Sequence, residues 1–98
     1  MVKSINVNDI DNIINDIELI DIREPFETIP KALLNSVNIP MDILLSKPTE
    51  YLNMDKEYYI ICRSGARSLR TCSELDEKGF NVVNVVGGTA GYTGTNLK

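Results

Sequence analysis

Histidine and tryptophan are absent from this chain of 98 residues, and only two cysteines, Cys62 and Cys72, are present. Without histidine or a Cys-x-x-Cys pair, the sequence offers no ligand set for a thiolate or imidazole zinc site, so we expect no metal. The chain also shows no transport signal, which indicates a reducing compartment. We therefore expect two free thiols rather than a structural disulfide.

Long apolar runs and an excess of positive charge are also lacking. No apolar stretch approaches the roughly 18 residues that span a bilayer, and residues 1–6 lack the apolar centre of a signal peptide. The net charge of −4 argues against a nucleic-acid partner, because a phosphate backbone requires clustered positive charge. We therefore expect a cytoplasmic protein that has neither a membrane nor a nucleic acid as its partner.

The residues that are present predict a single α/β domain over residues 1–98. Short apolar runs alternate with helical segments, which is typical of a mostly parallel five-stranded sheet with helices on both faces. The expected strands are residues 3–5, 18–21, 36–39, 58–62 and 82–85. The first expected helix is capped by Asn8 or Asp9 and carries Ile10, Ile13 and Ile14. The other expected helical segments are residues 41–45, 48–52 and 68–78, and a short, weak helix after residue 87.

Within segment 68–78, a repeat of apolar residues predicts the buried face. Leu69, Cys72 and Leu75 recur every three residues and are expected on one side of the helix, with Phe80 following a stop at Gly79. Cysteine is a good small apolar core residue, so we interpret Cys72 as part of the core. The alternative is that Cys72 is a resolving thiol.

The loop Cys62-Arg63-Ser64-Gly65-Ala66-Arg67 has the clearest chemical meaning in the sequence. A strand that ends at a cysteine before small residues and a helix leaves backbone N–H groups unpaired, and these can stabilise a negative charge on sulfur. Such surroundings lower the pKa of cysteine from about 8.5 into the range of roughly 3.5 to 7.5. We therefore interpret Cys62 as a nucleophile, with a buried structural cysteine at a strand end as the alternative.

Other residues of this loop carry expectations of their own. A tight loop whose N–H groups converge on one atom needs a residue that tolerates positive φ, which Gly65 does. Arg63 and Arg67 lie at a helix N-terminus, where their charges oppose the macrodipole, so we expect them to contact an anion. Arg70 lies one turn further and is expected on the surface. A positive spot on an acidic protein suits a small anionic ligand.

Three segments of the chain together resemble the rhodanese-type sulfurtransferases. Residues 62–68, Cys-Arg-Ser-Gly-Ala-Arg-Ser, between a strand and a helix resemble the active-site segment of that family. Residues 19–27 resemble its early Asp-x-Arg-x-x-x-Glu signature. The strand end that follows this signature in the family is similar to Asn-Ile-Pro at residues 38–40, which lies at the expected distance. Residues 82–88 resemble its last strand and glycine turn, with Tyr92 where an aromatic residue, usually tryptophan, is expected. The resemblance implies a rhodanese-like domain fold.

One segment departs from the family pattern. Between Glu27 and Asn38 the family usually carries a Gly-His-Ile-Pro-Gly-Ala run, whereas residues 28–37 read Thr-Ile-Pro-Lys-Ala-Leu-Leu-Asn-Ser-Val at equal length. The contacts that this segment makes around the active site therefore do not follow from the resemblance.

The resemblance implies transfer of a sulfane sulfur by double displacement. The Cys62 thiolate attacks the outer sulfur of a small anionic donor, thiosulfate or a persulfide, and a thiol, cyanide or an acceptor protein then removes the sulfur. No metal or organic cofactor is required. The expected site comprises Cys62 as the catalytic residue and Arg63, Ser64, Gly65, Ala66 and Arg67 as the residues that bind the substrate.

Asp21, Arg23 and Glu27 are candidate supporting residues. The resemblance implies that Asp21 lies near the cysteine loop, with a scaffold salt bridge as the alternative. Arg23 and Glu27 have the i, i+4 spacing of a helical ion pair, so we expect mainly structural roles for them.

Two other functions remain open. A phosphatase or arsenate reductase of the cell-cycle phosphatase type also uses a cysteine loop with an arginine, but such enzymes are expected to have a longer loop than the four residues between Cys62 and Arg67. Some rhodanese-like modules only bind a partner, but they often lose the cysteine that this chain keeps.

Overall fold

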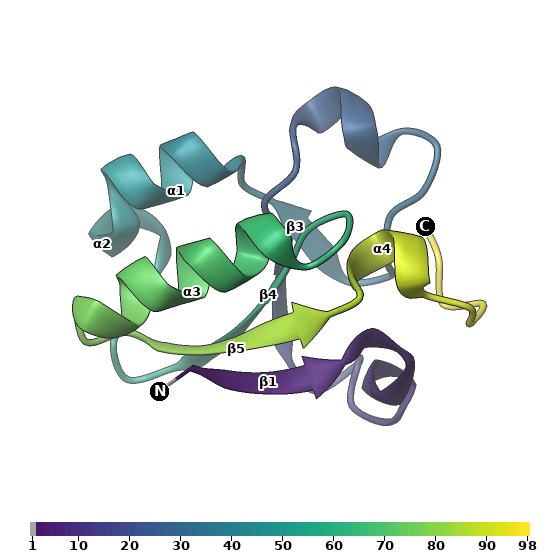
Figure 1. The fold of residues 1–98 in the computed structure, drawn as a ribbon, viewed down its shortest axis with the longest axis horizontal. Helices are drawn as coiled ribbons and strands as arrows, with labels where there is room; N and C mark the ends of the chain where they lie inside the picture. Colours follow the sequence, from purple (N-terminus) through teal and green to yellow (C-terminus); the bar gives the residue numbers. More distant parts are fainter. Residues whose placement is uncertain (1) are drawn as a thin grey trace.

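Every neighbouring pair of strands in the sheet is parallel (Figure 1). The structure, a computed structural model, describes residues 2–98. Within that range five strands form one sheet in the order β1-β5-β4-β2-β3. The strands are β1 (Lys3–Asn6), β2 (Glu18–Asp21), β3 (Ser36–Asn38), β4 (Glu57–Ile61) and β5 (Asn81–Val86).

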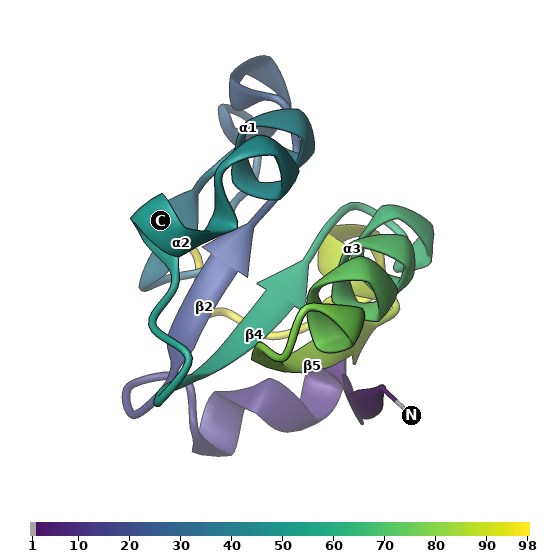
Figure 2. The ribbon, with the colours of Figure 1, turned by 90° about the vertical axis from the view of Figure 1, so that its left-hand side faces the viewer.

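The helices cover the two faces of the sheet unequally. They are α1 (Met41–Ser46), α2 (Pro48–Tyr51), α3 (Ala66–Glu77), α4 (Gly88–Gly91) and the 3-10 helices η1 (Val7–Asn12) and η2 (Pro25–Thr28). Figure 2 shows α1, α2 and α3 on one face and η1 on the other. Over residues 2–98, no helix combines the length and the apolar character that crossing a membrane requires.

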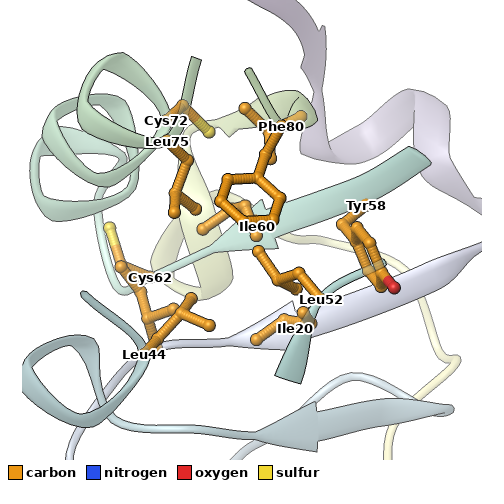
Figure 3. Packing of buried hydrophobic residues seen from close by; sticks show 11 residues of the cluster. Ile20, Leu44, Leu52, Tyr58, Ile60, Cys62, Cys72, Leu75 and Phe80 are labelled. Atoms are coloured by element: carbon orange, nitrogen blue, oxygen red, sulfur yellow. The ribbon is translucent and has the colours of Figure 1, made fainter. Parts of the chain in front are cut away.

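Side chains alternate between the two faces along each strand, and this alternation divides the core into two clusters. On β4, Tyr58 and Ile60 belong to the cluster beneath α1 and α3, whereas Ile61 belongs to the cluster beside η1. Figure 3 shows the first cluster, in which Cys62 lies beside Leu44 and the side chains of α3 pack near Phe80. Cys62 therefore belongs to the α3 face of the sheet.

All five predicted strands are confirmed to within one residue at each end, and the sheet is parallel throughout rather than mostly parallel. The first helix differs from its prediction. It is a 3-10 helix that Asn6 caps, because the Asn6 side chain accepts a hydrogen bond of 2.9 Å from the backbone N–H of Asn8. The predicted caps, Asn8 and Asp9, instead lie within the helix. Ile10 within the helix and Ile14 just beyond its end are buried, as the prediction for this segment requires.

The predicted buried face of α3 is only partly correct. Cys72 and Leu75 are fully buried, but Leu69 is 50% exposed. A spacing of three residues drifts around a helix with 3.6 residues per turn, so Leu69 points away from the sheet and Ser68 is buried in its place. The predicted stop is confirmed, because Gly79 has φ +93° and the N–H of the next residue, Phe80, returns to the carbonyl of Leu75.

Candidate active site

The loop between β4 and α3 lies at the carboxyl ends of the parallel strands, where open α/β sheets bind their ligands. Cys62 follows the last residue of β4, and Gly65 precedes the first residue of α3 with φ +104°. The left-handed conformation of Gly65, which glycine adopts without a Cβ penalty, turns the chain sharply into the helix. The conformation expected at Gly65 is therefore confirmed.

The start of α4 fixes the outer side of this loop. The N–H of Thr89 donates to the carbonyl of Cys62, and the N–H of Ala90 donates to the carbonyl of Arg63, each at 2.9 Å. Because these two carbonyls point toward α4, N–H groups of the loop are free to point inward. Gly88 permits the close approach, since a Cβ there would lie 2.3 Å from the Arg63 carbonyl oxygen.

The Cys62 sulfur is the point on which the inner hydrogen bonds converge. The N–H groups of Gly65 and Ser68 donate to Sγ at 3.1 and 3.3 Å, and the thiol lies 3.4 Å from the Ser68 hydroxyl. Burial opposes ionisation, but hydrogen bonds from the Ser68 side chain and from the backbone of Ser68, Gly65 and Ser64 outweigh it. The pKa of the Cys62 thiol is therefore lowered.

Ser68 and Asn84 extend this network below the sulfur, although neither was among the predicted site residues. The Ser68 hydroxyl lies 2.5 Å from Oδ1 of Asn84, a buried residue on β5. A polar residue inside the apolar run 82–86 is the sequence signal that could have identified Asn84. Ser68 could have been identified as the last residue of the 62–68 motif.

The Arg67 guanidinium contacts a carboxylate of the protein itself. Its two terminal nitrogens donate to the two carboxylate oxygens of Glu27 at 2.8 and 2.9 Å. These hydrogen bonds lower the pKa of Glu27 to about 2 and raise the pKa of Arg67. The expected helical pair between Arg23 and Glu27 is therefore wrong. Residues 25–28 form a 3-10 turn rather than an α-helix, and this turn directs Glu27 to α3.

Asp21 and Arg23 form a buried salt bridge, 2.6 Å between Oδ2 and a guanidinium nitrogen. The same guanidinium donates to the backbone carbonyls of Glu27 and Lys31 at 2.9 and 2.8 Å. The salt bridge that was the alternative for Asp21 is therefore present, and the charge of Asp21 also helps to raise the pKa of Arg67 in the cysteine loop. This bridge fixes the segment that carries Glu27 and Lys31 against the edge of the site.

A hollow of about 360 Å³ opens beside the loop. It is lined by Arg23, Glu27, Pro30, Lys31, Arg63, Thr89 and Ala90. Arg23 and Glu27 are paired, whereas the exposed Arg63 forms no ion pair within residues 2–98. Lys31 comes from the segment that departs from the family pattern, and its Nζ donates to the carbonyl of Tyr92 at 3.0 Å. In the part of the chain that the structure describes, the hollow therefore presents two positive charges, Arg63 and Lys31, without carboxylate partners.

Cys72 and Arg70 occupy the places that the sequence predicted for them. Both cysteines are free, and burial raises the pKa of Cys72 to about 12, which keeps its thiol protonated and unreactive. Arg70 is exposed and pairs with Glu74 one turn along α3. Neither residue faces the hollow.

Comparison with known proteins identifies the family. Residues 6–95 match the family described as rhodanese-like domain. A candidate sulfurtransferase of Bacillus subtilis, YtwF, is 44% identical over 79 residues, which cover 81% of this chain and 76% of that protein. A sulfurtransferase of Allochromatium vinosum is 35% identical, covering 74% of this chain and 68% of that protein. A crystal structure from Staphylococcus saprophyticus has a TM-score of 0.88 at 31% identity and covers 99% of both chains. The chain therefore belongs to the rhodanese-like domain family.

Proposed function

We propose that this protein is a sulfurtransferase in which Cys62 carries a sulfane sulfur, as a persulfide, from a donor to an acceptor. The observation that carries the proposal is the convergence of the Gly65 and Ser68 N–H groups on the Cys62 sulfur at 3.1 and 3.3 Å. Preorganised donors around one sulfur atom stabilise a thiolate and also the anion of a persulfide. The sulfurtransferases among its relatives support the same chemistry.

Thiosulfate serves as the reference donor for the first half-reaction. The Cys62 thiolate attacks the outer sulfur, a new sulfur–sulfur bond forms at Sγ, and sulfite leaves with the electron pair of the broken bond. In the second half-reaction cyanide or a thiol attacks the outer sulfur of the Cys62 persulfide. Thiocyanate or a new persulfide departs, and the Cys62 thiolate returns.

The hollow beside the loop is the proposed entry for the donor. Arg63 and Lys31 attract an anion there, while the Glu27–Arg67 pair is neutral as a unit. Cys62 itself has no exposed surface, so the loop must open enough to admit one sulfur atom. This requirement favours a small sulfane group over a bulky one.

Intact mass spectrometry tests the proposal. Incubation with thiosulfate is expected to add one sulfur atom to the chain, and subsequent cyanide is expected to remove it with release of thiocyanate. Cys62→Ser is expected to gain no sulfur, because a serine hydroxyl is not ionised at neutral pH. A folded protein that gains no sulfur from thiosulfate or from glutathione persulfide would contradict the proposal and favour a module that only binds.

A further inference from the structure

The hydroxyl of Ser68 has one proton but three possible acceptors around it. Its oxygen lies 3.4 Å from Cys62 Sγ, 3.1 Å from the Gly65 carbonyl and 2.5 Å from Asn84 Oδ1. A hydroxyl donates one hydrogen bond at a time, and the shortest of these contacts is the one to Asn84. In this arrangement the Cys62 thiol donates to the Ser68 oxygen, and Ser68 donates to Asn84.

This arrangement fits only the neutral thiol. An ionised sulfur has no proton to donate, so Ser68 must turn its O–H toward Sγ to stabilise the anion. The Ser68 oxygen would then face Asn84 Oδ1 at 2.5 Å with no proton between two acceptors. A half-turn of the Asn84 carboxamide replaces this oxygen by the NH₂ group, which donates to Ser68 and removes the repulsion.

Asn84 is suited to such a half-turn. The two ends of a carboxamide are nearly equal in size, so the rotation leaves the packing unchanged. Within residues 2–98 the Asn84 amide nitrogen makes no hydrogen bond that the rotation would break. Asn84 also lies on β5 between Val83 and Val85, where a buried polar side chain is costly unless it is hydrogen-bonded.

We propose that Asn84 is a positioning residue that sets the direction of the Ser68 hydroxyl, so that Ser68 accepts from the Cys62 thiol and donates to the Cys62 anion. The inference rests on the proposed function, in which Cys62 acts as an anion. Among the ionisable groups near this network, Arg67 and Cys72 interact with Cys62 directly, and Arg63 follows it in the chain. Glu27 and Asp21 act on Arg67, and Arg23 pairs with Asp21. Asn84 is uncharged, so replacing it by an uncharged residue alters none of these charges.

The test is a pH titration of the Cys62 thiolate, followed by its ultraviolet absorbance. Hydrogen bonds that lead to an anion are charge-assisted and stronger than neutral ones, so Asn84 stabilises the thiolate more than the thiol. Asn84→Ala is therefore expected to lower the ratio of thiolate to thiol at a given pH by roughly three- to tenfold, the size of one hydrogen bond. Ser68→Ala is expected to lower that ratio at least as much. Adding Asn84→Ala to Ser68→Ala is expected to change nothing further, because Asn84 acts through Ser68. Cys72, with a pKa of about 12, stays protonated over this range.

Two controls separate positioning from loosened packing. Thr71→Ala removes another buried hydroxyl of α3, which donates to the Arg67 carbonyl at 2.8 Å, and is expected to leave the titration unchanged. Asn84→Val suits a strand and replaces Asn84→Ala if that variant fails to fold. The proposal is overturned if the Asn84 variant titrates like the parent protein. It is also overturned if Asn84→Ala shifts the thiolate titration by the same amount in the parent protein and in the Ser68→Ala variant. Because the thiolate is observed directly, this outcome is independent of whether sulfur is transferred.

Discussion

The carboxylate of Glu27 accepts hydrogen bonds from two different segments of the chain. Arg67 donates two, and the backbone N–H of Glu24 donates a third at 3.0 Å. The Arg67 bonds are the main reason that the pKa of Glu27 is about 2 rather than 4.5. A carboxyl group whose pKa is lower in the folded state stabilises the fold above its unfolded pKa, and this stabilisation is lost as the pH falls toward the folded value.

Glu27→Gln is therefore expected to lower the free energy of unfolding at neutral pH by about 1 kcal/mol, a modest value because Arg67 is partly exposed. Between pH 4.5 and about 2, the unsubstituted protein loses this contribution on acidification, whereas the variant has none to lose. Urea unfolding at several pH values measures the difference. Glu50→Gln makes the same change on the exposed surface of α2 and serves as the control. Parallel pH profiles for the Glu27 variant and the unsubstituted protein would contradict the expected role.

At the scale of elements, the site depends on how closely α4 approaches the loop that follows β4. The backbone N–H groups of Thr89 and Ala90 can donate to the two loop carbonyls only because the preceding residue, Gly88, has no side chain and adopts φ +60°. A methyl group at this position would meet the carbonyl oxygens of Arg63 and Cys62 at 2.3 and 2.4 Å. Backbone atoms cannot yield as the end of a flexible side chain can, so the loop itself must move.

Gly88→Ala is expected to reduce sulfur transfer by at least about tenfold and to destabilise the fold by roughly 2 to 3 kcal/mol, through steric conflict and a strained backbone. Gly91→Ala, in the same helix, is the matched control, because its Cβ would lie 3.7 Å from a Val7 methyl group, an ordinary contact. Thiosulfate–cyanide turnover and thermal unfolding of both variants measure the two effects. Equal activity in the two variants would show that α4 does not determine the loop geometry.

Elements were more predictable than the contacts between them. The strands followed from apolar runs bounded by polar residues, and the stop of α3 followed from Gly79. The partners of Glu27 did not follow, because local spacing pointed to Arg23, whereas the turn at η2 brings Glu27 to α3, 40 residues further along the chain. Asn84 was missed for a similar reason, since only the packing of α3 on β5 places it beneath Ser68.

At the scale of the whole molecule, the chain has a net charge of −4, but its hollow is lined by two cations, Arg63 and Lys31, that pair with no carboxylate among residues 2–98. The acidic surface repels anions at long range, whereas Arg63 and Lys31 attract them at short range. Dissolved salt screens both interactions beyond a distance of about 8 to 10 Å at moderate ionic strength. The local attraction is strongest for a compact anion, such as the proposed donor thiosulfate.

Arg63→Ala is expected to raise the KM for thiosulfate by about three- to tenfold at low ionic strength, and by less at high ionic strength, because salt already weakens the lost attraction. Arg70→Ala changes the net charge equally but removes an exposed arginine paired with Glu74, so its KM is expected to remain near that of the unsubstituted protein. Steady-state kinetics over a series of salt concentrations distinguish the two variants. A similar rise in KM for both variants would indicate that donor binding depends on the net charge of the molecule. An unchanged KM for Arg63→Ala would show that Arg63 does not attract the donor.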